Sequence, residues 1–534
     1  MTASLDLLFN TPSPRLDLAR VRRVVSFVYA AGDSGGALAE ALEQVRLPES
    51  RFEPHCFERD IFLTEGARAL FSLRHEEPSD PLPLGYACAV LSRPPLAAED
   101  AQFRREVLGE LIASPELARE LEDLYARLTE LKKRITSSDP SNASQSVRRR
   151  LELLEDVRGV VDQLGAFEGC RSGLARLAAW SAALRETEAY RRLAQVLDYE
   201  ANLSVMDLRV GVGVDGRVRG FEVVRLTENA QNRFYVSPLK RLFTRLALWV
   251  RGYRVGEHEV LSRLVDHVFA SFEDEVAELL QLALDVRLYL GQLAFRERAR
   301  VAGLRTQVAT IKEGASQFEA LFNPLLLASG LHPIPCGIEV AAGQVTIVTG
   351  PNSGGKTRLL QSLAYAQLLA EGGWLVPAAR AEVTLAGGLF ASLLEEPNAG
   401  QTEGRLGSEL LRIRRVFENA CPGALILLDE LCSGTNPSEG EQLFQLVVEL
   451  LHELSPRALV TTHFLDLAER LAAEHHGEEL RFLQVELDDR TLPTFGFIPG
   501  VAVTSLARET AARLGVTRDE LLGLIRRPRK PRSA

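Results

Sequence analysis

Apolar residues recur every three or four positions through much of the first 300 residues of this 534-residue chain. This spacing indicates amphipathic helices over 97–128 and 146–200, and a long, nearly uninterrupted helical stretch over 238–300. If the first of these is two helices, Ser114-Pro115 is the expected joint, because proline favours the start of a helix. The turn-rich run 137–142 predicts a loop. The first half of the chain is therefore expected to be largely helical.

The apolar period changes from helical to alternating near residue 208. Residues 208–214, LRVGVGV, alternate in the way of a strand, and Asp215-Gly216 follows as a tight-turn signal. Residues 217–224 are expected to return as a second strand. The two strands and the turn between them predict a β-hairpin. A hairpin set between long helices buries little surface of its own, so we expect it to project from helical arms or to pack on their ends.

Three short, continuous apolar runs in the last third of the chain read as buried parallel strands, at 345–348, 424–428 and 458–462. Helical segments separate them, which is the pattern of an open α/β sheet. In such sheets, ligands bind at the carboxyl ends of the strands. The residues that follow these three runs are therefore the candidate ligand-binding and catalytic residues.

The first of these strands is followed by a phosphate-loop sequence, G-x-x-x-x-G-K-T, formed by Gly350, Pro351, Asn352, Ser353, Gly354, Gly355, Lys356 and Thr357. The glycines let successive backbone N–H groups point into one concavity at the start of a helix. Lys356 can reach the β- and γ-phosphates, and the Thr357 hydroxyl can ligate Mg²⁺. This loop predicts binding of a nucleoside triphosphate, with ATP and Mg²⁺ as the expected ligands.

The other two strands end in polar side chains suited to phosphoryl transfer. Asp429 is suited to hold Mg²⁺, and Glu430 to orient the attacking water, although two acids at a strand end can also simply face solvent. His463 follows the third strand in a position that mirrors Glu430. A lone histidine is more often structural than catalytic, but this position favours contact with the γ-phosphate. The turn-rich loop 433–437 is a candidate to line a partner's active site.

The segments TGPNSGGKT, LILLDELCSGTNPSEG and TTHF, in this order, resemble the ATPase domain of the MutS family, and the second is closest to its Smr-bearing subfamily. The resemblance implies an ABC-type nucleotide fold with two ATP sites composed across a homodimer. A weaker likeness covers GRVRGFEVVRL and ENAQNRFYVSPLKRL, which resemble the family's clamp strands and the return into its lever helix. FNPLLL resembles the family's entry into the ATPase, with Phe322-Asn323 where the family has Arg-His.

The chain departs from the family at the helix that normally opens with Ser-Thr-Phe and whose serine reaches the other subunit's γ-phosphate. Depending on register, that serine is replaced by Gly404 or Gly407; Ser408 can substitute, or helix-start N–H groups can suffice. We also expect no mismatch-wedge domain and no Smr domain. The Phe-x-Glu triplet at 295–297 is expected to be ordinary helix surface.

Near the C-terminus, residues 505–524 predict two short helices broken at Gly515, with Thr517 and Glu520 forming a capping box. Such an element could read DNA. Its second helix has few basic residues, and the resemblance implies a dimerisation element.

Composition and charge limit the binding partners and the cellular location that we expect. The net charge of −10 argues against indiscriminate polyanion binding, so nucleic acid would need local basic patches such as the tail 526–532. The arginine triplet 148–150 is expected on a solvated helix face. The chain has no membrane-length apolar run and no secretory signal, and its six scattered cysteines suggest neither a zinc site nor disulfides. A cytoplasmic protein is expected.

Together these observations predict a multidomain protein with a mostly α-helical core and lever, a small β clamp-like hairpin, and an α/β ABC-type ATPase. The expected division is 1–140 for the helical core, 141–310 for the lever with its hairpin near 206–236, and 311–534 for the ATPase with its C-terminal dimerisation element.

The resemblance implies an ATPase coupled to clamp-like binding of mismatched, damaged or branched DNA. Two alternatives remain open: an ATPase that acts on structured RNA or ribosomes, and a nucleotide-dependent protein scaffold with no nucleic-acid ligand.

Overall fold

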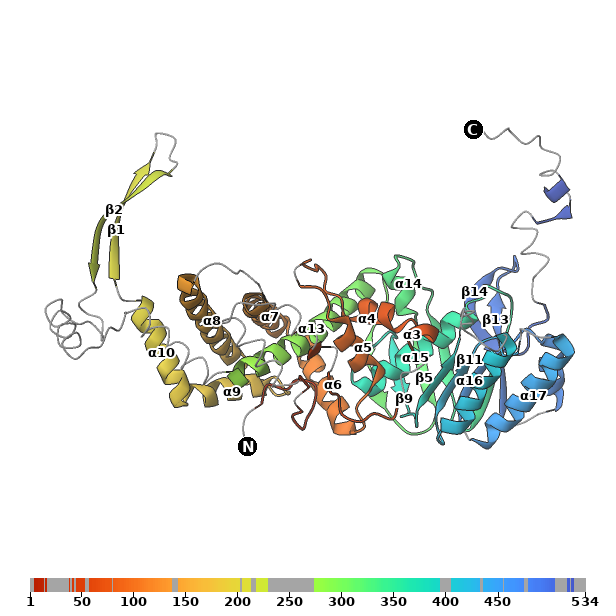
Figure 1. The fold of residues 1–534 in the computed structure, drawn as a ribbon. Coiled ribbons are helices and arrows are strands. Elements are labelled where there is room, and N and C mark those ends of the chain that lie inside the picture. Colours follow the sequence, from red (N-terminus) through yellow and green to blue (C-terminus); the bar gives the residue numbers. More distant parts are fainter. Residues whose placement is uncertain are drawn as a thin grey trace. The chain divides into compact units, whose positions relative to one another are not determined.

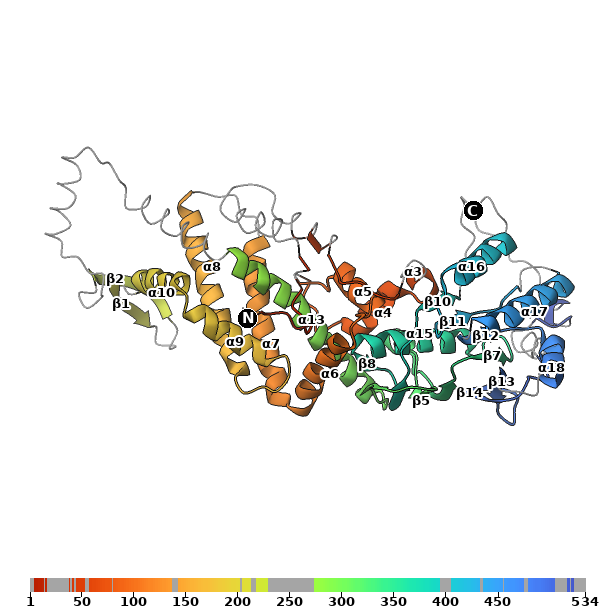
Figure 2. The ribbon, with the colours of Figure 1, turned by 90° about the horizontal axis from the view of Figure 1, so that it is seen from below.

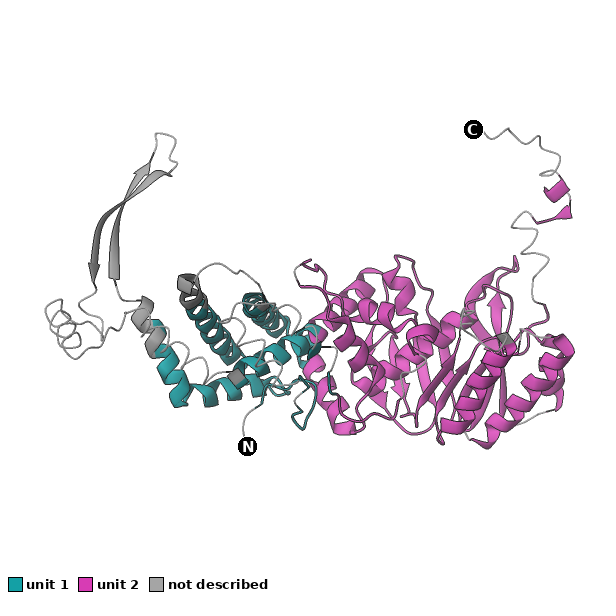
Figure 3. Ribbon diagram, viewed as in Figure 1, with its two compact units in different colours: residues 1–46, 110–287 teal, residues 47–109, 288–534 magenta. Residues whose placement is uncertain are grey.

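The computed structural model describes most of the chain, and Figure 1 shows the arrangement of its elements. The described residues are 4–13, 15–16, 38, 41–42, 45–52, 57–78, 80–136, 143–201, 204–212, 218–228, 273–393, 405–432, 436–454, 456–474, 479–504, 516–518 and 520–522. Packing divides the chain into two compact units, each built from two segments (Figure 3). Unit 1 comprises 1–46 and 110–287, and unit 2 comprises 47–109 and 288–534.

Unit 1 is helical, as the apolar spacing predicts. Its described elements are α7 (Pro115–Thr136), α8 (Ala143–Leu164), the 3₁₀ turn η2 (Gly165–Phe167), α9 (Ala175–Arg185), α10 (Glu188–Ala201) and the first half of α13 (Glu273–Val301). In α7 the leucines that face the core recur at helical spacing, at 121, 124, 128 and 131. The joint at Ser114-Pro115 is confirmed, because α6 (Ala98–Ala113) ends there and the Ser114 hydroxyl accepts the N–H of Leu117 at 3.3 Å.

The N-terminal segment is bound tightly within unit 1. The Arg15 guanidinium is fully buried and pairs with the carboxylates of Asp6 and Asp285, the latter on α13. Arg176 of α9 adds hydrogen bonds to the backbone carbonyls of Phe9 and Asn10, at 2.9 and 2.6 Å. A buried arginine needs such partners, since an unpaired buried charge is very costly. These contacts fix the first residues of the chain to the helices of unit 1.

The predicted hairpin is confirmed. Strand β1 (Ser204–Val212) pairs antiparallel with β2 (Val218–Glu228), in a register that places Gly211 opposite Gly220 and contains two irregularities. The turn at 213–217 lies outside the described residues.

Unit 2 contains a six-stranded sheet in the order β10-β11-β12-β7-β13-β14 (Figure 2). Its strands are β7 (Gln344–Thr349), β10 (Leu389–Ser392), β11 (Leu425–Leu428), β12 (Arg457–Thr461), β13 (Leu480–Leu487) and β14 (Pro493–Pro499). All neighbours are parallel except β13 and β14. The predicted parallel sheet is therefore confirmed, and the carboxyl ends of β7, β11 and β12 meet at one edge.

Further elements surround this sheet. The helices are α3 (Phe57–Asp60), α4 (Leu63–Phe71), α5 (Leu84–Ser92), α14 (Pro324–Ala328), α15 (Lys356–Gly372), α16 (Arg405–Asn419), α17 (Pro437–Glu453) and α18 (Leu465–Glu474). A second sheet has the order β4-β9-β5-β6, formed by Thr310–Ile311, Arg380–Val383, Ser316–Leu321 and Cys336–Val340. A short ribbon pairs β3 (Gln307–Val308) with β8 (Leu375–Val376). One hydrophobic core forms where buried side chains of β7, β11 and β12 pack against α16, α17 and α18.

Two expectations about individual residues are wrong. Phe295 is not helix surface: it is 1% exposed, and its ring lies 6.2 Å from that of Phe322. Arg150 is buried at 8% exposure, so the arginine triplet does not lie wholly on a solvated face. Both positions fall on helices, where one residue in three or four faces inward whatever its neighbours suggest.

The remaining expectations concern larger segments. Packing groups 47–109 with the six-stranded sheet of unit 2, and the expected domain division at 140 and 310 stays a prediction. The Thr517 half of the predicted capping box is confirmed, since the Glu520 N–H donates to the Thr517 hydroxyl at 3.4 Å. The Glu520 carboxylate accepts that hydroxyl at 2.6 Å, whereas a capping box pairs it with the backbone N–H of residue 517. The first helix of that element, the basic tail and residues 229–272 lie outside the described residues. Within the described ranges, no helix is both long and apolar enough to cross a bilayer.

Candidate active site

The phosphate loop leaves β7 and enters α15 in the conformation that its glycines predict. Gly350 and Gly355 have positive φ angles of 139° and 89°, and Gly355 directly precedes the first residue of α15. At Gly354, a Cβ atom would lie 2.9 Å from the Val485 side chain and 3.0 Å from the Pro351 carbonyl oxygen. The loop therefore needs glycine here for close packing against β13, and this packing sets its curvature.

Lys356 lies inside this loop. Its Nζ donates to the carbonyl oxygens of Gly350 and Pro351, at 3.0 and 3.1 Å, and the side chain is buried. Burial lowers the pKa of the ammonium, while the nearby carboxylates of Glu430 and Asp429 oppose that effect. A phosphate oxygen is a stronger partner for an ammonium than a peptide carbonyl. The site is thus suited to a triphosphate that takes over these two hydrogen bonds.

Asp429 follows β11 and is held by two threonines from different elements. Thr357 on α15 donates to its Oδ2, and Thr461 on β12 donates to its Oδ1, each at 2.5 Å. Burial raises the pKa of this carboxyl, and the two hydroxyl donors act in the opposite direction. A hydroxyl and a carboxylate placed side by side are oxygen ligands of the kind that Mg²⁺ takes, together with phosphates and water. Across the described chain no cluster of three His, Cys, Asp or Glu residues forms a separate metal site.

Glu430 and His463 meet at the same edge of the sheet. His463 Nε2 lies 2.7 Å from Glu430 Oε1, and both side chains are partly exposed. Glu430 has a positive φ of 50°, a backbone conformation that a residue with a Cβ seldom adopts. The structure thus brings together Lys356, Thr357, Asp429, Glu430 and His463, as the converging strand ends predict.

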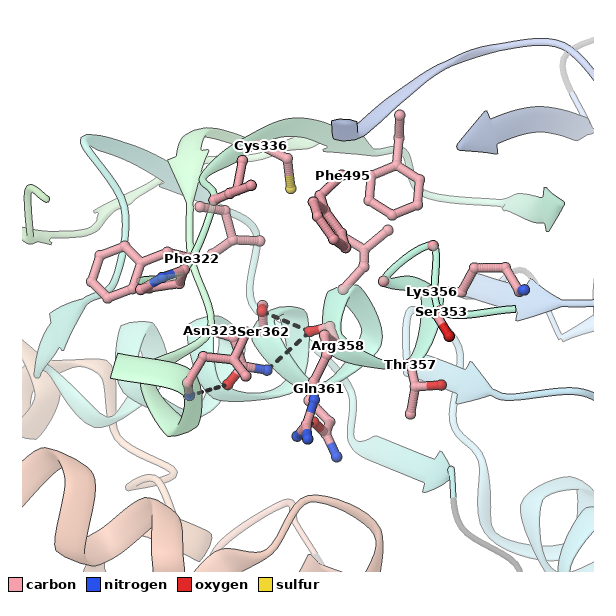
Figure 4. Close-up of a pocket in the computed structure, with 18 of the residues that line it drawn as sticks. Phe322, Asn323, Cys336, Ser353, Lys356, Thr357, Arg358, Gln361, Ser362 and Phe495 are labelled. Carbon is pink, nitrogen blue, oxygen red and sulfur yellow. Dashed lines mark hydrogen bonds between the residues drawn. The ribbon is translucent and has the colours of Figure 1, made fainter. Parts of the chain in front are cut away.

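A cavity of about 630 Å³ opens beside the phosphate loop, a size typical of small-molecule sites. Figure 4 shows Phe322 and Phe495 with the loop residues Lys356 and Thr357 around it. Its other aromatic lining residues are Phe62 and Phe497. This composition suits a flat, largely apolar ring placed next to phosphates.

No local pattern in the sequence points to Phe62, which precedes α4 in a left-handed conformation nearly 300 residues before the loop. Phe495 lies in the segment TFGFIPG, whose pattern is that of a strand. Only the order of the strands in the sheet brings it near the phosphate loop: a Cβ atom added at Gly355 would lie 3.1 Å from the Phe495 ring. Asn323 caps α14 by accepting the Leu325 N–H at 2.9 Å, and its Nδ2 donates to the Arg358 carbonyl at 3.1 Å. Asn323 therefore ties α14 to the start of α15.

Ser408 lies in the first turn of α16 and is not among the residues that line the cavity. Its neighbour Glu409 is buried and accepts the Cys432 N–H at 2.6 Å. Gly407 belongs to the same turn, and Gly404 lies outside the described residues. The role of Ser408 at a partner's nucleotide stays a prediction, as does that of the loop 433–437, whose residues 433–435 also lie outside the described part of the chain.

Residues 346–515 match the family model of MutS domain V. Among curated proteins, the chain is 30% identical over 295 residues to endonuclease MutS2 of Thermomicrobium roseum, covering 51% of this chain and 36% of that protein. It is 32% identical over 306 residues to endonuclease MutS2 of Streptococcus agalactiae, covering 55% and 37%. With endonuclease MutS2 of Pelotomaculum thermopropionicum it shares 33% identity over 237 residues, covering 42% and 29%. The matched part of the chain spans about a third of the length of these relatives.

Proposed function

We propose that the protein, whose residues 346–515 match the model of MutS domain V, hydrolyses Mg-ATP at sites composed across a homodimer and couples this to clamp-like binding of DNA. One observation carries the proposal: a phosphate-loop lysine and threonine, two acids and a histidine from three parallel strands share one sheet edge.

Each of these residues has a part in the proposed reaction. Lys356 binds the β- and γ-phosphates, and the nucleobase enters the aromatic cavity lined by Phe495. Thr357 and Asp429 would hold Mg²⁺, which supplies charge neutralisation to the phosphates. Glu430 orients the attacking water, and its hydrogen bond to His463 fixes the carboxylate. His463 is then also placed near the γ-phosphate.

The nucleic-acid part of the proposal rests on unit 1 and on the relatives. Helices and a β-hairpin make up unit 1, and the matched relatives are named endonucleases. ATP that closes the composite sites would favour one arrangement of the helical arms over another and so change the affinity for DNA. Recognition of mismatched, damaged or branched DNA would then depend on its shape and deformability. A cytoplasmic location is part of the same proposal.

A binding panel tests this coupling. Purified full-length protein is titrated at low salt with duplex, mismatched and branched DNA and with structured RNA, each with and without ATP. We expect ATP to change the affinity for at least one DNA structure, and binding to weaken steeply with salt. ATP-modulated binding to structured RNA alone would instead favour action on RNA or ribosomes.

A protein scaffold is the second candidate, favoured by the missing signature serine and the net charge of −10. Glu430→Gln separates it from a DNA clamp, because this variant should trap an ATP-bound dimer. If the trapped dimer binds each nucleic acid with the same affinity as the nucleotide-free protein, the result favours the scaffold over the clamp.

A further inference from the structure

The hydroxyl of Thr461 makes two hydrogen bonds to consecutive residues of the neighbouring strand end. It donates to Asp429 Oδ1 at 2.5 Å and accepts the backbone N–H of Glu430 at 2.8 Å. A threonine hydroxyl has one proton to donate, so this geometry assigns that proton to Asp429. Thr461 is the last residue of β12 and is fully buried. The Thr461 hydroxyl is therefore closed to solvent, whereas Asp429 and Glu430 are partly exposed.

The bond to Glu430 supports an unusual backbone. Regular pairing continues to Asp429, whose N–H donates to the Ser392 carbonyl of β10 at 2.9 Å. At Glu430 the chain turns into the left-handed region, with φ of 50°, and its N–H passes to the Thr461 hydroxyl instead. Such a conformation in a non-glycine residue persists only where surrounding contacts hold it. This turn directs the Glu430 carboxylate to His463.

The hydrogen bond from Thr461 to Asp429 has a different role from the one that Thr357 donates to the same carboxylate. Thr357 is the expected Mg²⁺ ligand of the phosphate loop, so its hydroxyl oxygen would serve the metal and its hold on Asp429 would change. Thr461 has no such second task, because it lies on the far side of the carboxylate, at Oδ1. When nucleotide binds, the orientation of Asp429 therefore depends on Thr461.

We propose that Thr461 is a positioning residue that sets the two acids of the site with a single hydroxyl: it orients the Asp429 carboxylate for the metal and fixes the backbone turn that presents Glu430. This inference rests on the proposed ATPase function and adds a residue to it. Neighbours that orient metal ligands typically change metal affinity or activity by about 10- to 100-fold when removed.

Substitutions at Thr461 can separate the hydroxyl from packing. Thr461→Val keeps the branched shape that suits a strand and removes the hydroxyl. Thr461→Ser and Thr461→Ala differ from each other only by the hydroxyl, and so give a second comparison if the valine variant folds poorly. Thr346→Val is a matched control, because Thr346 is 1% exposed in the adjacent strand β7 and pairs with Leu459, two residues earlier in β12.

Two measurements test the proposal: the Mg²⁺ concentration that half-saturates binding of a fluorescent, non-hydrolysable ATP analogue, and kcat with KM for Mg-ATP. For Thr461→Val and Thr461→Ala we expect the Mg²⁺ requirement to rise and kcat to fall by about tenfold or more. Analogue affinity in EDTA and thermal stability should change little, Thr461→Ser should stay close to wild type, and Thr346→Val should match it.

The result that overturns the inference is equally specific. If Thr461→Ser and Thr461→Ala are equally impaired, or if Thr461→Val matches wild type in Mg²⁺ requirement and kcat, the hydroxyl positions nothing. Either result concerns only the role of Thr461, and the proposed function stands as long as the wild-type protein hydrolyses ATP in the same assay. If binding of the analogue to the wild-type protein does not depend on Mg²⁺, both the Thr461 inference and the proposed function are wrong.

Discussion

Gly66 of α4 faces the phenol of Tyr365 so closely that a Cβ atom at this glycine would lie 1.9 Å from the phenolic oxygen. Tyr365 is on α15, the helix that begins at the phosphate loop, and its buried hydroxyl shares its one proton between the backbone carbonyls of Ile61 and Phe62, at 2.6 and 2.9 Å. The segment that brings Phe62 to the cavity beside the phosphate loop is thereby fixed to the phosphate-loop helix.

We expect Gly66→Ala to lower the free energy of unfolding by about 1–3 kcal/mol, because the added methyl group has no space. Tyr365→Phe should cost about 1 kcal/mol through the lost hydrogen bonds. Gly85→Ala on α5 is the matched control: a Cβ atom added there would have nothing within 4 Å, so alanine should be neutral or stabilising. Urea denaturation measures all three, and equal effects at Gly66 and Gly85 would contradict this contact.

Lys356→Ala should weaken ATP binding by roughly 10- to 100-fold, the range for losing hydrogen bonds to a charged group. Thermal stability should not fall, since burial of the ammonium already works against the charged form. Lys312→Ala removes a lysine that directly follows β4 and pairs with Glu382, and it should leave nucleotide affinity unchanged. Calorimetric titration with ATP provides the measurement, and wild-type affinity in Lys356→Ala would refute the assigned phosphate site.

Phe495→Ala tests whether the aromatic cavity holds the base. Base–aromatic stacking contributes about 1–3 kcal/mol, so the variant should lose roughly tenfold in ATP affinity. Binding of inorganic tripolyphosphate, which has no base, should be unchanged. Ile498→Ala is the control, because this residue is 40% exposed on the same strand and does not line the cavity. Equal losses for ATP and tripolyphosphate would place the base elsewhere.

Glu371 gives a pH dependence of stability. Its Oε1 accepts the Ala386 N–H at 2.7 Å and the Gln367 amide at 2.6 Å, and burial raises its pKa above the ordinary 4.5. The folded state therefore holds this proton more tightly than the unfolded state. The stability associated with it is complete below pH 4.5 and is lost as pH rises through the raised pKa.

Glu371→Gln keeps an oxygen acceptor and cannot ionise. It should be more stable than wild type at about pH 8, with the advantage shrinking toward about pH 5. Glu297→Gln is the control of opposite sign, since its hydrogen bond to Arg300 lowers the pKa of Glu297. Urea denaturation at the two pH values provides the test, and a Glu371→Gln advantage that does not depend on pH would contradict it.

The sequence alone determined the phosphate loop, the acids after β11 and the histidine after β12, because each is a local pattern whose position at a strand end follows from the sheet. It also predicted the hairpin, because alternating apolar residues and a turn signal are local features of the sequence. It did not reveal Phe62 and Phe495 as walls of one cavity, or the packing of 47–109 with the six-stranded sheet.

Those features depend on contacts between segments up to several hundred residues apart, which leave no periodic trace in either segment. Phe295 illustrates the limit: it reads as helix surface until its ring is found against Phe322. The role of Thr461 depends on hydrogen bonds across two strands, and only the tertiary structure brings its one hydroxyl to both acids.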